Sequence, residues 1–185
     1  MKIRYNAPTV LTFAFLCAAI LILSQTAFRS LTVQWFAVPG RGNFYPSFRN
    51  FVTLFTHVIG HASWTHLVAN FSVILLIGPI LEESYGSISL LIMISITALV
   101  TGLLNIFFFN TGLLGASGVV FMMILLASFT NFNKGEVPLT FILIMILYLG
   151  RELYNAFVDT QGNVSEFAHI VGGFIGSLFG FFRYK

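Results

Sequence analysis

Charged side chains are scarce in this sequence of 185 residues. They make up 8% of the chain, whereas hydrophobic residues make up 57%; a soluble domain has roughly 25% charged residues. Water could not solvate a surface with so little charge, so the composition predicts an integral membrane protein surrounded by the lipid bilayer. The nine Lys and Arg residues are scattered, which leaves no basic patch of the kind that binds nucleic acid.

Cysteine is nearly absent as well. The single Cys17 lies in the first apolar run and cannot form an intrachain disulfide, so we interpret it as a small buried hydrophobe. That run follows Lys2 and Arg4, as in a signal peptide, but no small-residue cleavage site comes after it. We therefore expect the run to be retained as a membrane span.

Long uncharged runs supply the helices that the composition requires. About 20 apolar residues are needed to cross the hydrocarbon, and charges or turn residues such as Asn110-Thr111-Gly112 separate the runs. We expect an all-α fold, with one membrane domain over residues 1–185 and six transmembrane helices, the first two joined by a long loop. The expected spans are residues 8–28, 64–81, 87–108, 115–129, 137–154 and 166–182.

An even number of spans places both termini on one side of the membrane. Lys and Arg are more frequent on the cytoplasmic side, and five of them would share the side of the termini, against four opposite. We therefore expect both termini in the cytoplasm, and a prokaryotic inner membrane as the location. The five are Lys2, Arg4, Lys134, Arg183 and Lys185, and the four are Arg29, Arg41, Arg49 and Arg151.

Few polar side chains lie inside the expected spans, and each is a functional candidate because the membrane penalises them. His66 and Asn70 lie near the start of the second span and share a helix face. Ser117 lies near the start of the fourth span, and His169 near the start of the sixth. These spans run in the same direction, so the four side chains are expected at one depth, in one water-accessible cavity.

Small residues indicate which of these spans pack together. Ser117 lies within Gly115-Ala116-Ser117-Gly118, and Gly172 and Gly176 follow His169 at a spacing that lets two helices approach closely. We expect Gly118 to pack on this strip, which would bring Ser117 towards His169.

Each of these residues also has a purely structural explanation. A serine in a membrane helix usually bonds to the carbonyl four residues back, a histidine often serves packing, and glycine strips are common in helix bundles. We interpret His57 and His61 as structural residues that hold the first loop. The combination of residues favours a site more strongly than any one of them.

Together these residues resemble the motifs of rhomboid intramembrane serine proteases. The resemblance covers roughly residues 50–182, and three motifs follow in the order and at the spacing of the family. They are the second-span signature His57-x3-His61-x4-His66-x3-Asn70, the Gly-x-Ser-Gly motif at residues 115–118, and the sixth-span motif Ala168-His169-x2-Gly172-x3-Gly176.

The resemblance implies a rhomboid-like six-helix bundle and a role for each matching residue. Ser117 would be the nucleophile and His169 the general base, while His66, Asn70 and the Ser117 amide would hold the oxyanion. No metal and no cofactor are implied, and the substrates would be single-pass membrane proteins cut within the bilayer. The supporting residues would be Gly115, Gly118, Phe121, Gly172 and Gly176.

The sequence departs from the family pattern at two places. Val52-Thr53 replaces a Trp-Arg pair in the first loop, shortly before Thr56-His57. Phe121 replaces a tyrosine that stacks on the catalytic histidine. Stacking survives this second change, whereas a hydroxyl hydrogen bond is lost.

Other functions fit the residues less well. Aspartyl intramembrane proteases need two Asp residues, and this chain has only Asp159; the segment His57–His61 lacks the glutamate of a zinc protease. A small transporter would need charges in the membrane or paired broken helices. The main alternative is a catalytically inactive rhomboid-like protein that binds client transmembrane segments.

Overall fold

The described part of the chain is helical. The computed structural model describes residues 2–129, 139–150, 154 and 164–183, and within them the elements are helices apart from one isolated β-bridge, Val38 to Leu113. The helices are α1 (Pro8–Gln25), α2 (Leu31–Trp35), α3 (Phe48–Thr56), α4 (Trp64–Tyr85), α5 (Ser87–Phe108), α6 (Ser117–Ala127), α7 (Leu139–Ile144), the π-helical segment η1 (Met145–Leu149) and α9 (Val164–Arg183). The expected all-α fold is confirmed.

Among the described residues, three helices, α1, α4 and α5, are long and apolar enough to cross a membrane. The helix α6 and residues Glu166–Phe182 of α9 are apolar but shorter. The helix α7 and the segment η1 lie within the expected span over residues 137–154. Other parts of this span lie outside the described residues, and so do Lys134 and Asp159. The count of six spans therefore stays a prediction.

The long first loop is not the plain loop that the sequence suggested, because it contains α2 and α3. The helix α3 begins where the Ser47 hydroxyl accepts a hydrogen bond from the Asn50 amide at 3.2 Å, a usual way to cap a helix. One face of α3 is buried, with Asn50, Thr53 and Leu54. Its other face leaves aromatic side chains exposed, a pattern suited to the membrane interface.

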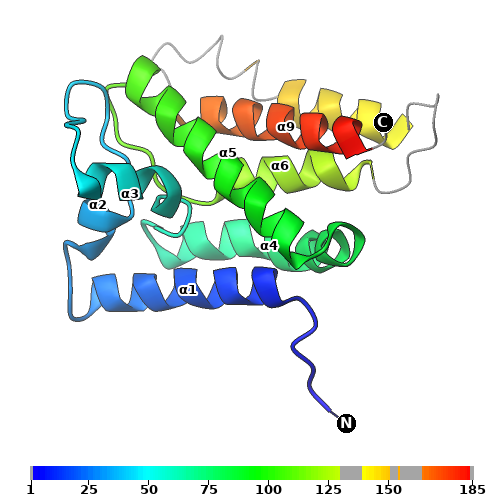
Figure 1. Cartoon of the computed structure of the whole chain (residues 1–185), viewed down its shortest axis with the longest axis horizontal. Coiled ribbons are helices and arrows are strands. Elements are labelled where there is room, and N and C mark those ends of the chain that lie inside the picture. Colours follow the sequence, from blue (N-terminus) through cyan, green and yellow to red (C-terminus); the bar gives the residue numbers. More distant parts are fainter. Residues whose placement is uncertain (1, 130–138, 151–153, 155–163, 184–185) are drawn as a thin grey trace.

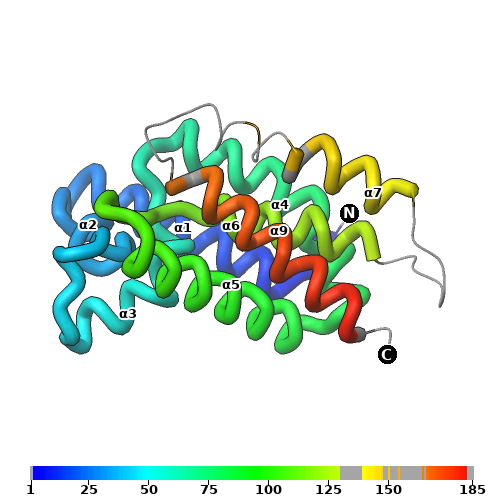
Figure 2. The backbone as a smooth tube through the Cα atoms, turned by 90° about the horizontal axis from the view of Figure 1, so that it is seen from above, coloured from blue at the N-terminus to red at the C-terminus, as the bar shows by residue number. Residues whose placement is uncertain are grey.

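The helices α4, α6 and α9 run in the same direction, starting at the end of the molecule where α2 and α3 lie (Figures 1 and 2). The helix α1 runs the opposite way along α4, and α5 crosses the others at an angle (Figure 1). The starts of α4, α6 and α9 are thus at one end of the bundle, as expected for the second, fourth and sixth spans.

The centre of the bundle is α6, which packs against both α4 and α9. Its sequence is apolar on every side, which is typical of a helix that is buried all round. The buried residues of α6 are Gly118, Val119, Val120, Phe121, Met122, Met123, Leu125 and Leu126.

The start of α1 is fixed by a carboxylate from another helix. The helix has no side-chain cap of its own, and the Glu82 carboxylate of α4 accepts hydrogen bonds from the Thr9 amide at 2.8 Å and the Val10 amide at 3.0 Å. A negative charge stabilises the N-terminus of a helix. Because Glu82 is buried and paired in this way, α4 continues to Tyr85, beyond its expected end at residue 81.

The first loop is held in place although it lacks the Trp-Arg pair. Val38 and Leu113 exchange backbone hydrogen bonds of 2.9 and 3.0 Å, which join the loop to the segment before α6. The Gly115 amide donates to the His57 carbonyl at 2.9 Å, and His57 Nε2 lies 3.3 Å from the Thr101 hydroxyl of α5. These contacts are consistent with the structural role predicted for His57, which stays a prediction.

Candidate active site

Ser117 is the first residue of α6, and the backbone before it explains why the helix starts there. Gly115 has a φ of +114°, a conformation that residues with a side chain rarely adopt. The turn at Gly115 leads into α6, which begins at Ser117, two residues after the start of the expected span at residue 115. Ser117 is half-buried, and it stands at the end of the helix where the amide N–H groups have no partner within the helix.

Glycines bring α6 and α9 into close backbone contact. A Cβ on Gly172 would lie 2.0 Å from the Gly118 carbonyl oxygen, and one on Gly176 would lie 2.2 Å from the Met122 carbonyl oxygen. No side chain fits at such distances, so the predicted packing of the two helices on this strip is confirmed. A Cβ on Gly118 would lie 3.3 Å from the Ala168 carbonyl oxygen. Ser117 and His169 are the chain neighbours of these two residues.

His169 is stacked on an aromatic ring of α6. The His169 and Phe121 rings are nearly parallel, at 5°, with centroids 4.3 Å apart. Phe121 comes one turn after Ser117 on the same helix face, and helical side chains lean towards the N-terminus of their helix. The stack therefore places the His169 ring on the Ser117 side of α6.

His66 reaches the same place from α4. The Ser63 hydroxyl caps α4 by accepting a hydrogen bond from the His66 amide at 3.1 Å, which sets His66 in the first turn. A Cβ on Gly115 would lie 2.6 Å from His66 Cε1, so the imidazole rests against the turn that leads into Ser117.

Asn70 is buried one turn further along α4 and is held by His61. The Asn70 side-chain amide donates to His61 Nε2 at 3.2 Å, and His61 Nδ1 lies 3.1 Å from the Ile59 carbonyl oxygen. The carbonyl can only accept, so the proton of a neutral His61 belongs on Nδ1, and Nε2 receives the hydrogen of Asn70. The His61 ring also packs edge-on against His66, with centroids 5.0 Å apart.

Burial keeps both loop histidines neutral. It lowers the pKa of His57 to about 4 and the pKa of His61 to about 4. Both rings are therefore uncharged at neutral pH, which the hydrogen bond from Asn70 to His61 requires.

The support of Asn70 by His61 is the feature that the sequence did not reveal. His61 was interpreted as holding the loop, and the nine-residue separation between the two side chains follows no helical repeat. The loop itself brings them together, because it folds back beside α4 before the helix begins at Trp64.

The site thus joins parts of three helices. His66 of α4 lies against Gly115 in the turn before Ser117. His169 of α9 stacks on Phe121 of α6. Asn70 of α4 is hydrogen-bonded to His61. Over the described residues, no group of three or more His, Cys, Asp or Glu side chains could hold a metal ion. The cavity and the catalytic roles stay predictions.

The sequence is similar to known membrane proteins over most of its length. The profile of the Rhomboid domain matches residues 49–185. Rhomboid protease GlpG of Haemophilus influenzae is 24% identical over 134 residues, which cover 70% of this chain and 68% of that protein. RHOMBOID-like protein 1 of Arabidopsis thaliana is 32% identical over 136 residues, which cover 69% of this chain and 33% of that protein. The family match includes every motif residue of the site and more than half of the sequence, and the chain belongs to the rhomboid family of integral membrane proteins.

Proposed function

We propose that the protein is an intramembrane serine endopeptidase that cuts the transmembrane segments of single-pass membrane proteins. Ser117 is the nucleophile, and His169 is its general base. The observation that carries this proposal is the parallel stack of His169 on Phe121, one helical turn from Ser117, across a contact that only glycines permit. A relative named as a protease supports the same chemistry.

The reaction follows from what each group can donate or accept. His169 takes the proton of the Ser117 hydroxyl while the oxygen attacks the scissile carbonyl carbon. The proton then passes to the leaving amine as the peptide bond breaks and an acyl-enzyme remains. Water, deprotonated by His169, attacks the ester and releases the second product, which restores the serine.

In this proposal, three donors near the start of α6 hold the oxyanion. The Ser117 amide is one of the unpaired N–H groups of the helix N-terminus. The His66 imidazole, against Gly115, and the second N–H of the Asn70 amide are the others. Donors fixed in place before the reaction stabilise the charge that develops in the transition state.

The bilayer and the direction of the helices complete the proposal. The protein has six spans with both termini in the cytoplasm of a prokaryotic cell, and substrates enter from the lipid. The site lies near the outer surface, since α4, α6 and α9 all begin there.

The test is cleavage of a single-pass membrane protein by the purified enzyme in detergent. We expect a stable product from the wild type, also with EDTA present, and none from Ser117→Ala. The matched control is Ser128→Ala, because the Ser128 hydroxyl, just after the end of α6, donates to the Ile124 carbonyl at 3.2 Å. A wild type that binds the substrate without cutting it would support the inactive, client-binding alternative. Cleavage by folded Ser117→Ala at the wild-type rate would exclude Ser117 as the nucleophile.

A further inference from the structure

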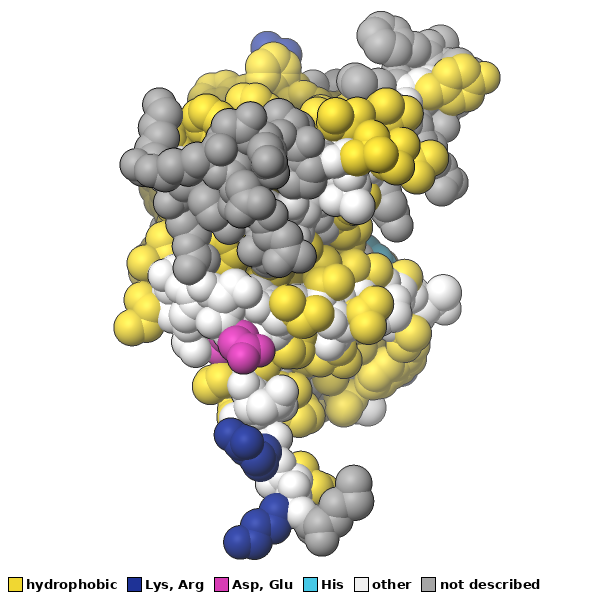
Figure 3. Space-filling view, turned by 90° about the vertical axis from the view of Figure 1, so that its right-hand side faces the viewer, with side chains coloured by type: hydrophobic (Ala, Val, Ile, Leu, Met, Phe, Trp, Pro, Cys, Tyr) yellow, Lys and Arg dark blue, Asp and Glu magenta, His cyan; other side chains and the backbone are white. Residues whose placement is uncertain are grey.

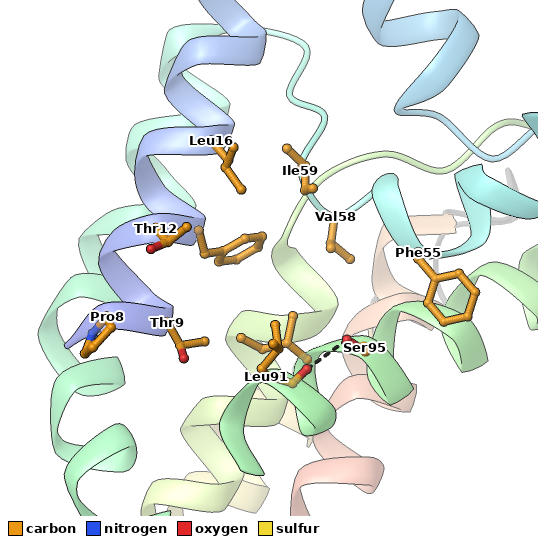
Figure 4. Close-up of a pocket in the computed structure, with 11 residues that line it drawn as sticks. Pro8, Thr9, Thr12, Leu16, Phe55, Val58, Ile59, Leu91 and Ser95 are labelled. Atoms are coloured by element: carbon orange, nitrogen blue, oxygen red, sulfur yellow. Dashed lines mark hydrogen bonds between the residues drawn. The ribbon is translucent and has the colours of Figure 1, made fainter. Parts of the chain in front are cut away.

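An apolar groove lies on a face of the molecule that the candidate active site does not use. Its volume is about 360 Å³, and it opens between α1, the end of α3 and α5 (Figure 4). Thr12 and Leu16 of α1 form one wall, Leu91 and Ser95 of α5 form the other, and Phe55 closes it from α3. Leu16, Leu91 and Phe55 are all exposed large hydrophobic side chains.

The groove is bounded at both ends. At one end the Thr9 hydroxyl donates to the Ser87 carbonyl at 3.0 Å and joins α1 to the start of α5. At the other end Val58 and Ile59, from the loop after α3, cover it (Figure 4). The α1 wall from Pro8 to Leu16 rises about 12 Å at 1.5 Å per residue. That is close to one leaflet of a hydrocarbon core about 30 Å thick, and it is too short for a second helix that crosses the bilayer.

The groove offers water few hydrogen-bond partners. The Ser95 hydroxyl donates to the Leu91 carbonyl at 2.8 Å, and the Thr12 hydroxyl is bonded to the Tyr5 hydroxyl at 2.9 Å. A buried water needs two to four polar partners, roughly three on average, and the remaining walls are apolar. Hydrocarbon is the occupant that suits such a surface in a membrane protein.

A polar pocket adjoins the groove where α1 begins. The two share Pro8 as a lining residue, and the pocket is lined by Lys2 and Arg4 of the N-terminal arm and by Glu83 of α4. Figure 3 shows basic side chains on this arm and acidic side chains beside it, below a largely hydrophobic surface. Glu82 also lines the pocket, but its carboxylate is occupied by the amides of α1.

We propose that the groove and the pocket together bind one phospholipid of the aminophospholipid class, phosphatidylethanolamine, from the leaflet on the side of the N-terminus. One acyl chain lies in the groove between α1 and α5. The phosphate pairs with Lys2 and Arg4, and the ammonium pairs with Glu83. The presence of both signs of charge in the pocket favours this zwitterionic headgroup over an anionic one.

The test is photocrosslinking in vesicles of defined composition. The probe is phosphatidylethanolamine with a diazirine in the middle of one acyl chain, and the labelled residues are located by mass spectrometry. We expect the label to concentrate on the α1 segment around Thr12 and the α5 segment around Ser95. Ser95→Phe fills the groove and should reduce the labelling to that of the exposed residues outside it. Ser89→Phe, the same change at an exposed position on α5 outside the groove, should leave it unchanged.

Two more variants complete the test: one checks that the loss of labelling is not due to misfolding, and the other tests the headgroup. Thr12→Phe fills the groove from the opposite wall and should reproduce the loss seen with Ser95→Phe. Glu83→Gln should remove the preference for the phosphatidylethanolamine probe over a phosphatidylglycerol probe with the same chain. Even labelling of all exposed surface, or labelling unaffected by both groove variants, would overturn the proposal. A stronger signal from phosphatidylglycerol would overturn the headgroup assignment.

Discussion

The side-chain amide of Asn70 has two hydrogens, and one of them forms a hydrogen bond within the protein. His61 accepts the first at 3.2 Å, so the amide is held in one orientation and its second hydrogen has a defined direction. Asn70 is buried, and a buried amide without such a partner would be costly. At the scale of single residues, His61 thus holds the Asn70 amide in one orientation, and the proposed mechanism uses Asn70 and His66 as oxyanion donors.

The first prediction separates donors from the reacting groups. Asn70→Ala and His66→Ala should each lower the cleavage rate by about 10²–10³, because removing one oxyanion donor has this effect. The loss should appear mainly in kcat, since the interaction strengthens in the transition state. Steady-state kinetics of the folded variants checks this, with the double variant expected to be slower than either. Full activity of Asn70→Ala would make Asn70 a packing residue.

A second residue-scale prediction concerns pH. Burial lowers the pKa of both His57 and His61 from 6.5 to about 4, so the unfolded chain binds more protons than the folded protein between these values. The free energy of unfolding should therefore be full above about pH 6.5 and fall as the pH drops towards about 4. The melting temperature in detergent across this range measures the effect.

The matched variant for the pH experiment is His61→Gln. Glutamine can still accept a hydrogen bond from Asn70 but does not titrate, so its melting temperature should depend less steeply on pH. A melting temperature that is flat or rises as the wild type is acidified would contradict the buried, neutral histidines.

At the scale of elements, the sequence predicted some helices well and others poorly. The bounds of α5 match the expected span of 87–108, because Glu83 and Gly86 interrupt the apolar run before it and Asn110-Thr111-Gly112 interrupts it after. The contact between α6 and α9 was also predictable, since the spacing of Gly172 and Gly176 is a local pattern. The extension of α4 past Glu82 was not, because it depends on amides of α1 that lie far away in sequence.

The helices of the first loop were missed for a different reason. The helix α3 buries polar residues such as Asn50 and Thr53 and exposes aromatic ones such as Phe48 and Phe51. This distribution is the reverse of a soluble amphipathic helix, and Pro and Gly around it favoured a loop. Similarly, the partner of Asn70 could be found only once the loop was folded.

The glycine contact between α6 and α9 gives the prediction for this scale. Gly172→Ala would place a Cβ 2.0 Å from the Gly118 carbonyl oxygen, so the helices must separate. We expect a loss of stability of about 1–3 kcal/mol or more, as for other overpacked sites, and a marked loss of cleavage as His169 moves from Ser117. Thermal unfolding and cleavage assays measure both.

Gly150→Ala is the control, because a Cβ there meets nothing within 4 Å. It should leave stability and activity near those of the wild type. If Gly172→Ala behaved like Gly150→Ala, the close approach of the two helices would be wrong.

At the scale of the whole molecule, the direction in which the helices cross the membrane decides on which side the candidate site lies. The helix α1 begins and α9 ends at the same end of the bundle, opposite α2 and α3 (Figure 1). A reporter fused after Lys185 should therefore report the cytoplasm, and one inserted in the loop at Asn43 should report the outside. The reverse result would place the site near the inner surface and change which part of a substrate it reaches.

The central claim is that Ser117 is a nucleophile activated by His169, and labelling with a fluorophosphonate tests it most directly. The reagent forms a covalent bond only with an activated serine oxygen, with loss of fluoride, and it requires no knowledge of the natural substrate. We predict labelling of the wild type on Ser117, as located by mass spectrometry, and none of Ser117→Ala or His169→Ala, provided that both variants melt like the wild type. A folded wild-type protein that takes up no label, or a label that persists in Ser117→Ala, would contradict the proposed mechanism.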